Sequence, residues 1–402
     1  MTVQAGEQVK PIDLARAREE TPGCANVIHF NNAGASLMPR PVLEAVLDHL
    51  RLEASIGGYE AAERALPSLE RVYDSLAALL GAHRDEIAVV ESSTRAWDMA
   101  FSSLRFGRGD RILTAAAEYA SNYIPFLQVV RRNGAIVDVV PSDPTGQVSV
   151  EALEGMIDDR VKLISLTYIP TNGGLVNPAR AVGAVARRAG VPFLLDACQA
   201  VGQMPVDVRE IGCDMLSATG RKFLRGPRAV GFLYVRREFL PQLEPALADM
   251  HGATWVSRDT YALRPDARRF ENFESNAATK LGLGVAVDYA MAWGLEAIRD
   301  RAWGLAATLR TKLPNVPGVT VRDIGAEKCA IVTFTMEGGK PEEIKSALAR
   351  QRINVTVTDA TATRLDMEGR GLLSMVRASV HYYNTEEEID RFCAALAGCS
   401  LK

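Results

Sequence analysis

The sequence is poor in cysteine and lysine, and it has no excess of charge of either sign. Its six cysteines are scattered through 402 residues without a C-x-x-C pair, which argues against a disulfide framework or a zinc site. The 46 basic and 49 acidic residues give a formal net charge of −3. A nearly balanced charge argues against nucleic acid or a membrane surface as a partner.

Long hydrophobic runs are absent as well. No stretch of about 18 apolar residues occurs, so we expect no membrane-spanning helix. The first 24 residues carry seven charged side chains and no apolar core of the kind that a signal peptide needs. With reduced thiols, these features predict a cytoplasmic protein. The content of 48% hydrophobic and 24% charged residues is typical of a globular protein. The length, compared with roughly 150 residues for a typical domain, predicts two domains.

Short strand patterns alternate with helical patterns over the first 240 residues. Strands separated by helices predict βαβ crossovers, and therefore an α/β fold with a mainly parallel, doubly wound sheet of seven strands. The last two strands are joined by a short loop, which permits an antiparallel pair. The predicted strands are 86–90, 111–114, 135–140, 162–166, 192–196, 215–218 and 231–235, and the predicted helices are 68–80, 94–105, 120–133, 149–158 and 178–189.

The pattern changes near residue 277 to one that is typical of a smaller α+β domain. We therefore predict an N-terminal segment, 1–30, that packs on the small domain, a large domain, 31–276, and the small domain itself, 277–402. The helices predicted in the small domain are 277–312, 341–350 and 385–397, and its strands are 319–323, 330–336, 353–358 and 375–380.

Two charged residues follow apolar strands in the segment 191–236. Asp196 ends its strand at the sheet edge where open α/β folds bind ligands, although an aspartate here can equally cap the next turn. Lys222 follows the next strand, and Arg221 and Arg225 beside it would disfavour its ammonium form, as a nucleophilic amine requires. Taken alone, such a lysine is more often a surface residue.

The two charged residues belong to a longer pattern that resembles the enzymes of aminotransferase class V, which depend on pyridoxal 5'-phosphate (PLP). This family includes cysteine desulfurases, selenocysteine lyases and isopenicillin-N-epimerase-like proteins. The resemblance extends from about 27 to about 384 and implies the fold-type-I architecture, PLP as the cofactor and a homodimer with its active sites at the subunit interface. The family motifs D-x-x-Q and (S/T)-G-(H/R)-K-x-x-(G)-P are matched by Asp196, Gln199, Thr219, Gly220, Arg221, Lys222, Gly226 and Pro227.

The resemblance assigns the central roles to three residues. Lys222 would form the Schiff base with the cofactor and then act as the base at the substrate Cα. Asp196 would pair with the pyridine nitrogen and keep it protonated, so that the ring accepts negative charge. Gln199 would form a hydrogen bond with the phenolic oxygen of the cofactor.

The phosphate group would be bound at the start of the helical pattern that follows the strand 86–90. A helix N-terminus offers unpaired N–H groups and a favourable dipole to an anion, although Ser93 and Thr94 could simply cap the helix. The resemblance assigns the phosphate contacts to Ser93, Thr94, Thr219 and Arg221.

Three further residues are expected around the ring and the substrate. Tyr119 stands where desulfurases carry a ring-stacking histidine; its aromatic face can stack equally well, but it lacks the proton-transfer range of imidazole. Asn172 matches a loop asparagine near substrate and cofactor, although Asn-Gly is also a common turn. Arg377 matches the arginine that binds the substrate carboxylate.

The chain departs from the desulfurase pattern in two places. Desulfurases carry a nucleophilic cysteine on the loop before Arg377, but no cysteine lies between 354 and 377, and Cys329 falls in a strand pattern that predicts a buried thiol. Where the family often brings a threonine to the phosphate of the neighbouring subunit, this chain has Glu274 followed by Ser275. A carboxylate beside a phosphate dianion is unfavourable, so either Ser275 takes that contact, as we predict, or Glu274 points elsewhere.

The segment GGYEAAE, which contains Tyr59, resembles one in the carbon–sulfur lyases of the ergothioneine pathway, although it could also be a simple helix junction. We therefore predict a PLP-dependent lyase that eliminates sulfur from Cβ of an amino acid, with Tyr59 as a substrate contact. An aminotransferase or an epimerase remains the alternative, because all three reactions begin with deprotonation of Cα. A desulfurase or a non-catalytic relative is less favoured.

Overall fold

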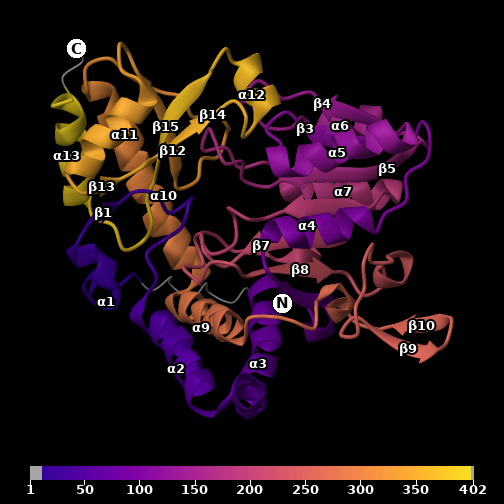
Figure 1. Ribbon diagram of the computed structural model, residues 1–402. Coiled ribbons are helices and arrows are strands. Elements are labelled where there is room, and N and C mark those ends of the chain that lie inside the picture. Colours follow the sequence, from indigo (N-terminus) through magenta and orange to yellow (C-terminus); the bar gives the residue numbers. More distant parts are fainter. Residues whose placement is uncertain (1–10, 400–402) are drawn as a thin grey trace, which may run out of the picture.

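A seven-stranded sheet forms the centre of the larger part of the molecule (Figure 1). The computed structural model describes residues 11–399. Only β8 of this sheet runs antiparallel to its neighbours, β7 and β2, which confirms a mainly parallel sheet with an antiparallel pair. In spatial order the strands are β2 (Ile87–Val90), β8 (Gly231–Val235), β7 (Met215–Thr219), β6 (Phe193–Asp196), β5 (Val161–Thr167), β3 (Arg111–Ala115) and β4 (Ile136–Val140).

Helices cover both faces of this sheet because its strands are apolar on both sides. Leu194 packs into a cluster with Trp97 of α4 (Ser93–Ser102) and Phe126 of α5 (Ala120–Asn133). Its neighbours Phe193 and Leu195 point to the opposite face and pack with the remaining helices. The helices that contribute to that second cluster include α3 (Gly58–Leu80), α6 (Val150–Met156), α7 (Ala179–Ala189) and α8 (Val208–Ile211).

The smaller part contains a four-stranded antiparallel sheet. Its strand order is β11 (Val319–Val321), β12 (Ile331–Met336), β15 (Ser374–Ser379) and β14 (Thr356–Asp359). The associated helices are α10 (Leu295–Lys312), α11 (Pro341–Arg350), α12 (Arg364–Gly369) and α13 (Glu386–Ala397).

The N-terminal residues that the structure describes pack on this smaller part. The strand β1 (Ile28–His29) pairs in parallel with β13 (Ile353–Asn354). Arg18, in α1 (Leu14–Glu19), donates from Nη1 to the Glu388 carboxylate at 2.8 Å. Residues 1–10 of the predicted N-terminal segment lie outside the described range.

Several sequence-based boundaries are wrong. The single helix predicted over 277–312 is divided at Gly294 (φ 85°) into α9 (Ala277–Trp293) and α10, which are bent by 80° at this point. The helix α9 packs against α2 (Arg40–Ile56) and α3, whereas α10 packs against elements of the smaller part. The chain therefore passes to the smaller part nearer Gly294 than residue 277. The strand predicted over 353–358 is divided into β13 and β14, and the exposed hairpin of β9 (Ala253–Ser257) and β10 (Thr260–Leu263) was not predicted.

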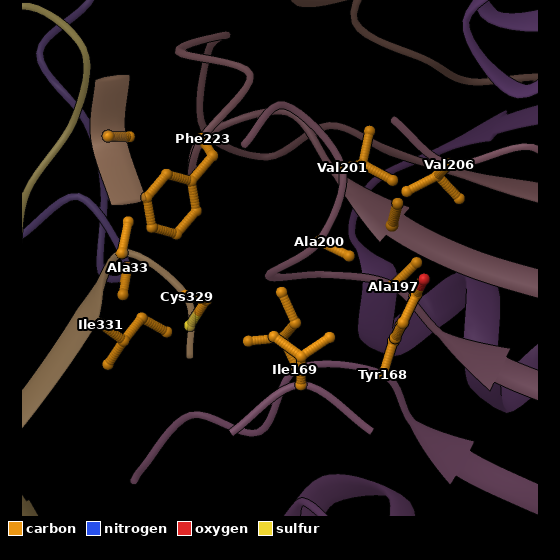
Figure 2. Packing of buried hydrophobic residues seen from close by; sticks show 14 of the residues in the cluster. Ala33, Tyr168, Ile169, Ala197, Ala200, Val201, Val206, Phe223, Cys329 and Ile331 are labelled. Carbon is orange, nitrogen blue, oxygen red and sulfur yellow. The ribbon is translucent and has the colours of Figure 1, made fainter. Parts of the chain in front are cut away.

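The hydrophobic core is continuous between the two parts. Figure 2 shows Phe223, next to Lys222, in one cluster with Ala33 and with Cys329 and Ile331 of the smaller part. Cys329 is fully buried, as its strand pattern predicted. Within residues 11–399, no single helix is long and apolar enough to cross a membrane, although the bent pair α9 and Leu295–Asn315 together meets that criterion of length and composition.

Candidate active site

One pocket of about 180 Å³ lies at the carboxyl ends of the parallel strands. Chain segments that leave β2, β3, β5, β6 and β7 all reach it, because parallel strands end at the same edge of a sheet. The structure thus brings together eight of the predicted site residues. They are Ser93, Thr94, Tyr119, Asp196, Gln199, Arg221, Lys222 and Arg377.

Lys222 follows β7 and lies in the same pocket as Asp196. Burial lowers the pKa of the Lys222 amine, and the positive charges of Arg221 and Arg377 lower it further, against the opposing effects of Cys198 and Asp196. A lowered pKa increases the fraction of neutral amine, the form that is nucleophilic and basic.

Arg225 does not act on Lys222 as predicted. Its guanidinium is buried against the smaller part, where Nε donates to the Leu37 carbonyl oxygen at 2.9 Å and Nη1 donates to the Tyr382 hydroxyl at 2.5 Å. The guanidinium carbon also lies 4.4 Å from the ring centre of Tyr383. Arg225 therefore ties the lysine loop to the smaller part, and Arg221 is the neighbouring charge that disfavours the ammonium form of Lys222.

The Asp196 carboxylate is 6% exposed and is held from two sides. Oδ1 accepts from the backbone N–H of Cys198 at 2.9 Å, and Oδ2 accepts from Nδ2 of Asn122 at 2.9 Å. These two hydrogen bonds hold the carboxylate in one orientation.

The N-terminus of α4 forms another wall of the pocket. The Ser92 hydroxyl accepts from the backbone N–H of Arg95 and thereby caps the helix, so Ser93 and Thr94 at the first two helical positions face the pocket. A Cβ at Gly231 would lie 2.6 Å from the backbone nitrogen of Ser93. Only glycine lets β8 approach this helix end so closely.

Two buried side chains in the pocket keep a polar atom without a partner. Gln199 donates from Nε2 to the Ala33 carbonyl oxygen at 3.1 Å, while its Oε1 has no hydrogen bond. Arg377 donates from Nη1 to the hydroxyl and, at 3.2 Å, to the carbonyl oxygen of Thr171, while its Nε has no partner. Burial lowers the pKa of Arg377 to about 10, so the group stays cationic at neutral pH and can bind an anion.

Asn172 does not line the pocket, and its predicted role stays a prediction. Its amide is 2% exposed and is used by the smaller part: Nδ2 donates to the Thr363 hydroxyl at 2.8 Å, and Oδ1 accepts from the Thr358 hydroxyl at 2.6 Å. The preceding residue, Thr171, lines the pocket instead. The sharp turn at Gly173 and Gly174, both with positive φ, directs these neighbouring side chains to different places.

Three other predicted residues do not line the pocket of this chain. Thr219 is buried at the end of β7, and its hydroxyl donates weakly to the Val230 carbonyl oxygen at 3.4 Å. Tyr59 is 77% exposed on α3. Ser275 lies with Glu274 in a second cavity of about 410 Å³ between β2 and the start of α9. Their proposed roles stay predictions.

The sequence reasoning missed several residues of the pocket. Asn122 and Cys198 line it directly, and Glu118 lies behind Asn122. Glu118 had a usable signal, because it is an acidic residue shortly after an apolar strand, as Asp196 is. Thr171 had none, since nothing in the local sequence distinguishes its direction from that of Asn172.

Comparison with known proteins assigns this chain to a family. The family model Aminotransferase class-V matches residues 28–392. The chain belongs to the aminotransferase class-V family. It is 31% identical to a cysteine desulfurase of Serratia proteamaculans, over 95% of this chain and 97% of that protein. It is 28% identical to a probable cysteine desulfurase of Methanothermobacter thermautotrophicus, over 92% and 94%.

Solved structures of this class share the fold. The apo structure of a cysteine desulfurase from Thermococcus onnurineus superposes with a TM-score of 0.89 at 26% identity, covering 98% of this chain and 99% of that one. The cystine C–S lyase C-DES, solved with its reaction product cysteine persulfide, has a TM-score of 0.83 at 23% identity, covering 94% and 99%. The chain therefore has the PLP fold type I.

The residues of the pocket fit the cofactor of the family. PLP has an aldehyde, a phenolic oxygen, a pyridine nitrogen and a phosphate, and the pocket offers an amine, a half-satisfied amide, a carboxylate and a helix N-terminus with Arg221. The unpartnered Oε1 of Gln199 is a polar atom that a bound group would satisfy. The chain is therefore a PLP-dependent enzyme of class V.

Proposed function

We propose that this class-V enzyme is a carbon–sulfur lyase that eliminates a sulfur leaving group from Cβ of an amino acid. The observation that carries the proposal is a pocket with a complete set of groups for Cα deprotonation but no cysteine suited to accept sulfur. Within the family this combination favours elimination over sulfur transfer.

Each residue has a role that follows from its surroundings. Lys222 would hold the cofactor and then take the proton from Cα of the substrate, and the Asp196 carboxylate would face the pyridine nitrogen. Gln199 would contact the phenolic oxygen, Tyr119 would stack on the ring, and Arg377 would bind the substrate carboxylate. Ser93, Thr94, Thr219 and Arg221 would surround the phosphate.

The bound cofactor supplies an electron-withdrawing ring that makes the Cα proton of the amino acid acidic. Once Lys222 has taken that proton, the Cα electron pair forms a Cα–Cβ double bond, and the Cβ–S bond breaks with its pair on sulfur. The thiolate takes up a proton and leaves as a thiol. The remaining unsaturated amine reacts with water to give pyruvate and ammonia, so no oxidant or reductant is required.

The cysteines support elimination rather than a desulfurase reaction. Cys198 is the cysteine on the pocket, and burial raises the pKa of its thiol to about 12, whereas sulfur acceptance needs a thiolate. The segment between Asn354 and Arg377 contains no cysteine. The name of C-DES, a cystine C–S lyase, is consistent with this chemistry on the same fold.

We also propose that the active enzyme is a homodimer in which each chain completes the pocket of the other. Ser275 and Tyr59 are exposed and lie outside the pocket of their own chain, so they could serve only in the pocket of a second copy. Exposed apolar residues on α2 and α3, namely Leu43, Leu47, Leu50 and Leu66, are suited to cover such an interface.

The proposal is tested with the purified holoenzyme and a panel of cysteine, cystine and S-substituted cysteines. We expect pyruvate, measured with lactate dehydrogenase, in equal amounts with the released thiol or persulfide, and none from alanine, which lacks a leaving group. Iodoacetamide at neutral pH should leave this activity intact, because the Cys198 thiol is protonated.

Three outcomes would contradict the lyase proposal. Pyridoxamine phosphate with a keto acid would indicate aminotransfer, and a racemised amino acid without pyruvate would indicate epimerisation. Alanine together with a protein-bound persulfide would indicate a desulfurase, the activity named for the curated relatives.

A further inference from the structure

Glu118 is a buried carboxylate just beyond the pocket. It follows β3 and is 3% exposed. Its Oε1 accepts from the backbone N–H of Tyr119 at 2.8 Å, from Nδ2 of Asn122 at 2.9 Å and from the Thr167 hydroxyl. Its Oε2 accepts only from the Thr114 hydroxyl, at 2.8 Å. The side chain is thus fixed by residues from β3, α5 and β5.

Asn122 connects this carboxylate with Asp196. The same nitrogen, Nδ2, donates to Glu118 Oε1 and to Asp196 Oδ2, both at 2.9 Å. An amide nitrogen has two hydrogens, so each carboxylate receives one of them. Asn122 is itself 3% exposed, and water therefore does not compete for this bridge.

The bridge brings a second negative charge close to the carboxylate that faces the cofactor. Burial raises the pKa of Glu118, the hydrogen bonds that it accepts from Thr167, Asn122 and Thr114 oppose this by favouring the charged form, and the charge of Asp196 raises the pKa further. Two carboxylates in one buried site repel each other. A neutral glutamine could satisfy the same donors without that repulsion, so local folding alone does not explain a glutamate here.

We propose that Glu118 is a positioning residue that acts through Asn122 on Asp196 and adds negative potential at the pyridine nitrogen of the cofactor. The proposal rests on the proposed place of Asp196 beside that nitrogen, and it holds whichever reaction the enzyme catalyses. The added negative potential would make the pocket bind the protonated ring, the form that accepts electrons, more tightly.

The variant E118Q removes the charge and keeps the hydrogen bonds. Oε1 of a glutamine can accept the three bonds that Glu118 Oε1 accepts, and its amide nitrogen can donate to the Thr114 hydroxyl, which can act as an acceptor. The matched control is E388Q. Glu388 is also buried and accepts from an asparagine four residues away, Asn384, at 2.9 Å, but it does not line the pocket.

The experiment compares the affinity of the apoprotein for PLP and for 1-deazapyridoxal phosphate, in which carbon replaces the ring nitrogen. Both ligands carry the same aldehyde and phosphate, so the ratio of their dissociation constants isolates the nitrogen. We expect E118Q to weaken PLP binding about fivefold and to leave the analogue within about twofold. E388Q should change neither value, and E118Q should have no further effect when combined with D196N.

The outcomes separate the inference from the assignment on which it rests. An equal loss for both ligands in E118Q would show a purely structural role, and an unchanged PLP affinity would show that the charge does not matter; either result overturns the inference. If D196N also fails to discriminate between the two ligands, the proposed place of Asp196 itself is wrong. Circular dichroism of each variant checks that it folds.

Discussion

Two groups of predicted site residues differ in where they lie. Those that follow the parallel strands meet in one pocket, and those on exposed segments lie away from it. Asp196 and Lys222 meet in one pocket within a single chain, because the sheet fixes the ends of β6 and β7 side by side. Tyr59 and Ser275 lie on outer segments, away from that pocket. The sheet therefore brings the charged residues of the pocket together within one chain, whereas Tyr59 and Ser275 would reach a pocket only through the proposed dimer.

The largest effect is expected for Lys222, inside the pocket. Replacing Lys222 by alanine should reduce pyruvate formation by about 10³-fold or more, because it removes the base at Cα, and the visible absorbance of the holoenzyme should be lost. Steady-state assays and an absorbance spectrum measure both. K328M is the control, since the Lys328 amine donates only to the Gly325 carbonyl oxygen. Substantial activity in K222A would show that Lys222 is not the base at Cα.

The proposed role of the exposed residue Ser275 is tested by combining two chains that carry different defects. If Ser275 serves the pocket of a second copy, a heterodimer of K222A and S275R contains one intact site and one doubly defective site. We expect such heterodimers, isolated by two affinity tags, to have about half of the wild-type activity, although each parent homodimer is strongly impaired. Heterodimers of K222A with wild-type chains also contain one intact site, and they should therefore reach the same activity. Activity no higher than that of S275R would place Ser275 outside any shared site.

The smallest effect separates two adjacent residues. T171A should raise KM about three- to tenfold, because the Thr171 hydroxyl accepts from Arg377, and T171S should restore it. N172A should leave KM near the wild-type value but lower the midpoint of thermal unfolding by about 2–10 °C, because its partners in the smaller part lose their hydrogen bonds. An increase of KM in N172A but not in T171A would show that Asn172, rather than Thr171, supports substrate binding.

Much of the fold was predictable because its signals are local. The helix 120–133 and the strand 231–235 have the predicted bounds, since hydrophobic periodicity, glycine stops and short apolar runs depend only on neighbouring residues. The predictions that failed depend on distant contacts. The bend at Gly294 follows from the separate packing of α9 and α10, and the exposed β9–β10 hairpin has little apolar burial to mark it.

The candidate site shows the same division. The motif around Asp196 and Lys222 predicted residues that lie together in one pocket, because strand ends in a parallel sheet converge at the same edge. The sequence did not reveal that Arg225 turns to Tyr382, or that Glu118 reaches Asp196 through Asn122. Both depend on side-chain directions that arise only after α5 and the smaller part have packed.

The linear pattern of residues was sufficient to predict the α/β architecture, the family and eight of the residues that line the pocket, because periodic burial and a spaced motif are properties of the chain itself. Only the tertiary structure decided which of two neighbours, Thr171 or Asn172, lines the pocket, and which buried charges share a hydrogen-bond donor. Those outcomes depend on how backbone turns aim individual side chains across packed layers, and no local pattern encodes that direction.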